Sequence, residues 1–220
     1  MELPVRERRR LLALLESVFN LPSQHGDVDS KVVAGLERLG QVFRVLLRQE
    51  AQEHKLSPIQ ARFLVYLLYH DVELRRVSQL AREFALTQAT VSDAVDSLEA
   101  KGLVDRERWP EDGRVMTLRL SPKGELVAAE LSTWADTVRE HLDLCPSEEK
   151  EVVMRFLMRL IGVLQESGVI TVARMCVTCR FFERDAHPGA SSPHQCRLLD
   201  VPLSGSDLRV DCPEHELARG

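Results

Sequence analysis

The chain has 220 residues, five cysteines and a net charge of −5 at pH 7. This length can bury a full hydrophobic core and predicts one or two domains. The sequence contains no run of about 18 apolar residues, which excludes a membrane-spanning helix and a membrane partner. The acidic balance excludes strong non-specific binding of nucleic acid through overall charge. Binding would need a local basic strip, for which the candidates are Arg75, Arg76, Arg108, Arg114 and Lys123.

The N-terminal part is predicted to contain two helices. Residues 5–19 form an amphipathic pattern, and the stretch 21–29 contains Pro, Gly and polar residues, as linkers do. From Ser30 to about His54, apolar residues recur at intervals of three and four, which indicates a long helix. We therefore expect residues 1–29 to form an N-terminal helix and linker, followed by the main domain.

The stretch from Val77 to Gly124 has the order helix, turn, helix, and then two strands joined by a charged loop. Ser78 is the expected N-cap of the first helix and Thr87 that of the second, because their hydroxyls can accept from a free backbone N–H. The second helix should end near Gly102, which suits a position that needs a positive φ. The order predicts a winged helix-turn-helix, mainly α with a small β-wing.

The exposed face of the second helix carries small or hydrogen-bonding side chains near its N-terminus, the part of a recognition helix that meets base edges. A solvated surface is the alternative for such a helix alone, but the adjacent wing favours DNA binding. In the wing, Asp112 can orient Arg114 toward a phosphate or a minor groove. The candidate DNA-binding residues are Thr87, Gln88, Ala89, Thr90, Ser92, Asp93, Asp112 and Arg114.

Two further helices are predicted, over residues 122–142 and 147–165. Ser121 and Pro122 are a suitable N-cap and first residue for the earlier one. The apolar residues of both helices are too numerous for one DNA-binding unit to cover, so we expect them to form the interface of a homodimer.

Residues 56–170 resemble the MarR family of bacterial transcription regulators. The similarity implies a two-fold dimer with interlocking terminal helices, and it gives Arg114 the role of the wing arginine that meets DNA. Asp93 and Ser97 depart from the family, whose members often carry basic residues there. The residues that carry the resemblance are Leu56-Ser57-Pro58-Ile59-Gln60, Thr90-Val91-Ser92, Leu98-Glu99-Ala100-Lys101-Gly102-Leu103-Val104, Asp112-Gly113-Arg114, Leu118, Ser121 and Lys123-Gly124.

The last part of the chain, residues 171–220, is rich in loops and cysteine, and its apolar clusters are short. Such a segment needs a cross-link, such as a disulfide or a bound metal, to fold. Disulfides are not expected in a cytoplasmic DNA-binding protein, because thiols stay reduced there. The array C-x2-C-x16-C-x15-C therefore predicts metal ligation by Cys176, Cys179, Cys196 and Cys212. Cys145 lies apart from this array and is expected to be a small buried side chain.

The identity of the metal remains open at this point. Zinc could be held by Cys176, Cys179, Cys212 and His215, but that set leaves Cys196 without a role. Iron–sulfur clusters use four cysteines, often with a proline after one of them, as in Cys212-Pro213. The spacing also resembles that of high-potential iron–sulfur proteins, which implies a [4Fe-4S] cluster and favours it over Zn²⁺.

The motifs together predict a sequence-specific regulator of transcription. We expect residues 30–170 to bind double-stranded DNA and dimerise, and the C-terminal tail to sense redox state or iron through its cluster. The alternative is a similar regulator with a structural zinc that responds to a small-molecule effector. Catalysis is not expected, because the sequence has no phosphate loop, no nucleophile elbow and no His-Glu-x-x-His motif.

Overall fold

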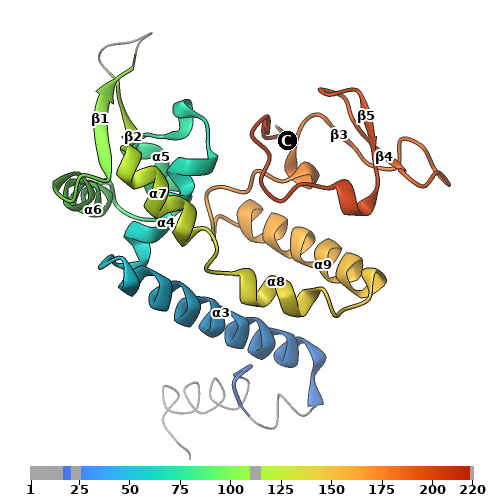
Figure 1. The fold of residues 1–220 in the computed structure, drawn as a ribbon. Coiled ribbons are helices and arrows are strands. Elements are labelled where there is room, and N and C mark those ends of the chain that lie inside the picture. Colours follow the sequence, from blue (N-terminus) through green and yellow to red (C-terminus); the bar gives the residue numbers. More distant parts are fainter. Residues whose placement is uncertain (1–16, 21–25, 110–114, 219–220) are drawn as a thin grey trace, which may run out of the picture. The chain divides into compact units, whose positions relative to one another are not determined.

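The computed structural model describes residues 17–20, 26–109 and 115–218. These residues fall into two compact units, which meet in the chain between Pro58 and Ile59. Their elements are labelled in Figure 1. Among the described helices, none is both long enough and apolar enough to cross a membrane.

The first unit is built on one long helix, α3 (Val28–Glu53). Asp27 caps it, because its carboxylate accepts from the backbone N–H groups of Asp29 at 3.2 Å and Ser30 at 2.8 Å. The long helix expected from residue 30 is therefore confirmed. Most of the helix predicted over residues 5–19 lies outside the described residues, and Ser17 to Asn20 form a turn.

The second unit begins with the predicted winged helix-turn-helix, and the mainly helical fold class with a small wing is confirmed. The wing strands are antiparallel, and Val104 lies opposite Leu120. The elements are α4 (Pro58–Tyr69), η1 (Val72–Leu74), α5 (Val77–Glu83), α6 (Gln88–Ala100), β1 (Val104–Arg108) and β2 (Met116–Leu120).

The start of α5 differs from the sequence-based expectation. The N-cap residue is Arg76, with φ −118° and ψ 151°, and not Ser78. The backbone N–H of Leu118 in the wing donates to the carbonyl of Arg75 at 2.7 Å. This bond holds the chain before the helix in an extended form, so the helix starts at Val77 without a side-chain cap.

The junction between α6 and the wing depends on two glycines. Gly102 has φ +66°, and the chain closes a Schellman motif there, with Gly102 N–H donating to Glu99 and Leu103 N–H to Leu98. At Gly124, a Cβ atom would lie 1.9 Å from the carbonyl oxygen of Leu103. Only glycine therefore allows the chain after the wing to approach the chain before it.

The single helix predicted over residues 122–142 is wrong, because the structure has α7 (Pro122–Leu131) and α8 (Asp136–Leu142). Ser132 donates its hydroxyl to the Ala129 carbonyl at 2.7 Å, and Thr133 donates to Glu130 at 2.8 Å. These bonds compete with helical hydrogen bonding and favour a break. The Ser121 cap of α7 and the following helix, α9 (Ser147–Glu166), agree with expectation.

The tail forms a small antiparallel sheet and lies along α9 (Figure 1). Ala173, Met175 and Leu208 are buried together with Met158 of α9, so the tail shares a hydrophobic cluster with that helix. Its elements are η2 (Cys176–Thr178), β3 (Phe182–Glu183), β4 (His194–Cys196), β5 (Val201–Leu203) and η3 (Gly205–Asp207), with strand order β3-β4-β5.

Candidate nucleic-acid interface and metal centre

The first turn of α6 presents the side chains that the sequence assigned to base contacts. Thr87, Gln88, Ala89, Thr90 and Asp93 are exposed, and the neighbouring Ser92 is half-buried. The hydroxyl of Thr87 accepts from the backbone N–H of Thr90 at 3.1 Å and lies 2.8 Å from the Thr90 hydroxyl. These two hydroxyls are thus held in place before any contact with DNA.

The opposite face of α6 fixes the rotation of the helix about its own axis. Val91, Val95 and Leu98 are completely buried, as is Leu80 on the preceding helix α5. Burial of such side chains contributes about 1.5–3 kcal/mol each. This buried stripe leaves the N-terminal polar residues of α6 facing solvent.

An arginine of the wing offsets the acidic charge of α6. Arg106 on β1 donates hydrogen bonds to Asp96 and to Glu99, both on the later turns of the helix. The hydrogen bond to Asp96 is the main reason that the pKa of Arg106 is raised. Two carboxylates that would repel phosphates are therefore paired within the fold.

The residues of the predicted basic strip have different environments in the structure. Arg75 is engaged within the fold, because its Nε donates to the carbonyl of His70 at 2.7 Å. Arg76 lies over the ring of Trp109, which directly follows β1, 5.5 Å from the ring centroid, and Arg108 is exposed. Lys123 donates to the carbonyl of Lys101 at 3.1 Å. Asp112 and Arg114 lie outside the described residues.

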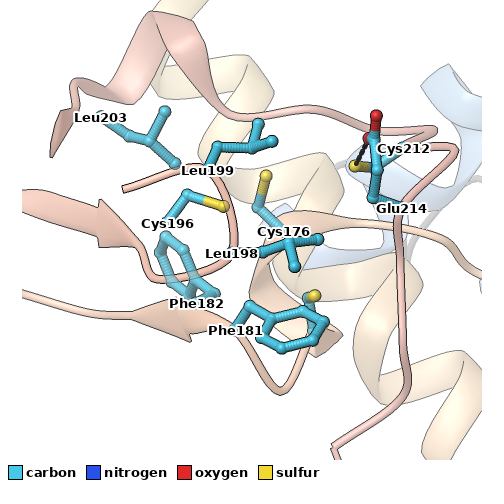
Figure 2. A pocket seen from close by; sticks show the side chains of 10 residues that line it. Cys176, Phe181, Phe182, Cys196, Leu198, Leu199, Leu203, Cys212 and Glu214 are labelled. Atoms are coloured by element: carbon cyan, nitrogen blue, oxygen red, sulfur yellow. Dashed lines mark hydrogen bonds between the residues drawn. The ribbon is translucent and has the colours of Figure 1, made fainter. Parts of the chain in front are cut away.

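The four cysteines of the predicted array meet in one place. Cys176, Cys179, Cys196 and Cys212 all line one small pocket, although they come from η2, the residue after it, β4 and the C-terminal loop. Figure 2 shows the labelled cysteines around this pocket. Its other lining residues are mostly apolar: Phe181, Phe182, Leu198, Leu199, Leu203 and Glu214.

Polar contacts hold two of these thiols. The Cys176 sulfur accepts from the backbone N–H of Arg209 at 3.2 Å, and the Cys212 sulfur lies 3.3 Å from a carboxylate oxygen of Glu214 (Figure 2). Burial raises the pKa of both the Cys176 and the Cys212 thiol. A metal that binds here must therefore displace protons from the sulfurs.

His215 and Cys145 do not line this pocket. His215 has its Nε2 atom 3.0 Å from the hydroxyl of Thr178. Cys145 is half-buried in the loop before α9, with its sulfur 3.9 Å from the His141 carbonyl oxygen. Within the described ranges, no three His, Cys, Asp or Glu side chains are already grouped as ligands of a single ion.

Sequence reasoning missed a polar cluster beside the pocket. Arg174 is only 12% exposed and pairs with Asp211 at 2.7 Å and with Glu83 of α5 at 2.8 Å. Burial opposes the charge of Arg174, but these two carboxylates raise its pKa. Hydrogen bonds with His70 and Arg174 hold the pKa of Asp211 well below its ordinary value. The only sequence signal was the position of Arg174 and Asp211 next to the cysteine motifs.

The geometry of α5, α6 and the hairpin defines a winged helix-turn-helix protein. Residues 54–115 match the model of the MarR family, so this segment is similar to the winged helix of MarR proteins.

Solved structures share this fold. The transcriptional regulator PA3341 is 25% identical, with a TM-score of 0.55 over 61% of this chain and 98% of its own. MepR of S. aureus in its DNA-binding conformation is 21% identical, with a TM-score of 0.55 over 61% and 98% of the two chains. The S. aureus MepR–DNA complex is 20% identical, with a TM-score of 0.53 over 60% and 97%. The likeness to MepR concerns the fold.

Proposed function

We propose that this protein is a dimeric, sequence-specific DNA-binding regulator of transcription that senses redox state or iron through a [4Fe-4S] cluster in its tail. The observation that carries the proposal is the meeting of four distant cysteines in one pocket of a chain that also has a MarR-type winged helix. The regulator acts by binding and releasing DNA, without catalysing a reaction.

DNA binding is supported by the recognition helix. Its first turn carries exposed hydrogen-bonding side chains, and the acids of its later turns are paired with Arg106. The transcriptional regulator PA3341 and the DNA-bound MepR have similar folds. In the dimer, two recognition helices would enter successive major grooves about 34 Å apart.

The homodimer is supported by apolar side chains that lie exposed on α9. Val152, Val153 and Val163 are each more than half exposed. Exposed apolar surface of this kind marks an interface, and a two-fold partner would cover it with the same surface of a second copy.

The cluster is supported by the donor set. A zinc ribbon would need His215, which does not line the pocket, and would leave Cys196 without a role. A [4Fe-4S] cluster takes four cysteine thiolates, and the four cysteines that line the pocket supply that number. The apolar rings and leucines of the lining would keep water away from the cluster.

The test uses the whole protein purified without air. We expect a brown chromophore, with iron and sulfide in equal amounts, and salt-dependent binding to duplexes selected from a random DNA pool. A colourless protein that contains zinc would reject the cluster and leave the DNA-binding function intact. Failure to bind any duplex would instead indicate a winged helix used for protein contacts.

A further inference from the structure

Arg174 lies between the cysteine pocket and the helix-turn-helix and contacts both. Its side chain is only 12% exposed and that of Glu83 22%, so this ion pair is shielded from water, whereas Asp211 is 51% exposed. Its guanidinium carries five N–H donors in a fixed fork, which suits it to hold several partners in one geometry.

On the side of the helix-turn-helix, Arg174 holds the end of α5. Its Nη1 atom donates to the carboxylate of Glu83 at 2.8 Å, and Glu83 is the last residue of that helix. Thr171 adds a second contact, as its hydroxyl donates to the carbonyl of Arg82 at 2.6 Å. These contacts fix the residues that lead directly into the turn before the recognition helix.

On the side of the pocket, Arg174 holds the segment that carries Cys212. Its Nε donates to Asp211 at 2.7 Å and its Nη2 to the other oxygen of that carboxylate at 3.3 Å. The backbone N–H of Cys212 donates to the carbonyl of Arg174 at 2.8 Å. Cys176 follows Arg174 by two residues in the chain. Two of the four cysteines are therefore tied to the position of this arginine.

The end of α4 completes the cluster. His70 donates through Nδ1 to the Tyr66 carbonyl at 2.9 Å, and its ring stacks on Tyr66 with centroids 3.8 Å apart. The His70 Nε2 atom lies 3.0 Å from Arg174 Nη2 and 2.9 Å from Asp211. Asp211 thus reaches both the arginine and the α4 helix of the DNA-binding fold.

We propose that Arg174 is the positioning residue that couples the state of the cysteine pocket to the helix-turn-helix, an inference that rests on the proposed cluster. A bound cluster fixes Cys176 and Cys212, and with them Arg174 and Asp211, so the end of α5 is held. Loss of the cluster frees the Cys212 segment, Asp211 leaves the arginine and His70, and α5 loses its restraint. The DNA-binding helix then changes its preferred position.

The experiment compares the full-length wild type with Arg174→Gln and Glu83→Gln. Each protein is loaded with ferrous iron and sulfide, and a portion is stripped with a chelator. Affinity for one selected DNA duplex is measured in both forms, together with iron content and hydrogen exchange of residues 77–83. Arg180→Gln is the matched control, because Arg180 makes a similar pair with Glu216 inside the tail.

We expect the affinity of the wild type and of Arg180→Gln to differ by about tenfold between loaded and stripped forms, within the usual range of coupling. In Arg174→Gln and Glu83→Gln that ratio should fall below about twofold while the iron content is unchanged. Exchange at residues 77–83 should rise on stripping only in the wild type and the control.

The outcomes separate the two proposals. If both variants keep the iron and the wild-type ratio, the coupling role of Arg174 is overturned and the sensing function stands. If the wild type itself binds DNA equally in both forms, the sensing function fails and the coupling fails with it. Glu83→Gln, which lies on the helix-turn-helix and not in the tail, keeps the test decisive if Arg174→Gln does not fold.

Discussion

The helix-turn-helix and the cysteine tail are stabilised in opposite ways. The helix-turn-helix buries Leu80, Val91, Val95 and Leu98 completely and closes α6 with a side-chain cap and a glycine. The described part of the tail has strands of only two or three residues. Its buried apolar residues are Ala173, Met175 and Leu208, which share their cluster with Met158 of α9.

This difference separates a part with one stable form from a part whose order can depend on a ligand. Under the proposed function, a segment with so little core of its own would gain folding free energy from the cluster that it binds. In the proposed regulator, this conditional part would act on the permanent one.

The largest effect is expected from the cysteines of the pocket. Cys176→Ser, Cys179→Ser, Cys196→Ser and Cys212→Ser should each abolish the chromophore and loosen the tail, because a cubane needs four thiolates. DNA binding should persist without its response to iron or oxidant. Iron content and visible absorption of the purified variants provide the measurement.

Two controls sharpen this prediction. Cys145→Ser should keep the chromophore, because Cys145 does not line the pocket. The decisive pair is Cys196→Ser and His215→Ala. If Cys196→Ser retains full metal content and His215→Ala loses it, the site is a zinc ribbon made of Cys176, Cys179, Cys212 and His215.

In the stable region, Gly124→Ala should be strongly destabilising. The added Cβ would lie 1.9 Å from the Leu103 carbonyl oxygen, and such overpacking should lower the free energy of unfolding by about 3 kcal/mol. Urea unfolding measures it. Gly35→Ala, in helix α3 with open space around it, should instead stabilise by about 0.5–1 kcal/mol. Equal midpoints for the two variants would contradict the close approach at Gly124.

Base recognition should depend on the first turn of α6. Gln88→Ala or Thr90→Val should cost about 1–3 kcal/mol of binding free energy on the preferred duplex. Random duplexes should be bound almost as before, because base contacts specify sequence while phosphate contacts position the protein. Equal losses on both kinds of DNA would assign these residues to backbone contacts.

A smaller effect is expected from the wing. Arg114→Ala should weaken binding to all duplexes and lower the slope of log affinity against log salt by about one unit, as loss of one phosphate contact does. Titrations at several salt concentrations measure it. Arg139→Ala removes the same charge from an exposed site on α8 and should leave the slope unchanged. An unchanged slope in Arg114→Ala would place that side chain off the DNA.

The smallest effect is expected on assembly. A fragment that ends at Gly168 should still sediment as a dimer, because the exposed valines of α9 precede that point. Removal of the tail uncovers Met158, so the fragment should be less stable by about 2 kcal/mol. If the fragment is monomeric, the dimer contacts lie in the tail instead.

The sequence predicted the elements whose signals are local. Helix α6 combines a Thr87 cap, a buried stripe and the left-handed Gly102, all within 16 residues of chain. The start of α5 could not be predicted, because the bond from Leu118 to Arg75 that determines it comes from the wing. The break between α7 and α8 depends on Ser132 and Thr133, which are also common inside helices.

For the two candidate sites, the spacing of cysteines in the sequence was informative. The sequence did not indicate which charged residues would pair in the fold. The cysteine array was visible because its members are of one rare type, and the structure brings all four to one pocket. Arg174 could not be recognised, since its partners Asp211 and Glu83 are 37 and 91 residues away in the chain. Charged residues are common on surfaces, and only folding distinguishes a buried junction from a solvated pair.

The stacking of Arg76 on Trp109 gives the protein an optical reporter of its own wing. The chain has two tryptophans, Trp109 at the end of β1 and Trp134 in the turn between α7 and α8. With Trp134→Phe, the remaining emission comes from the ring beneath the Arg76 guanidinium. Movement of that cation away from the ring changes the field that the indole experiences and shifts its fluorescence. Engagement of the wing can therefore be followed in real time without an attached dye.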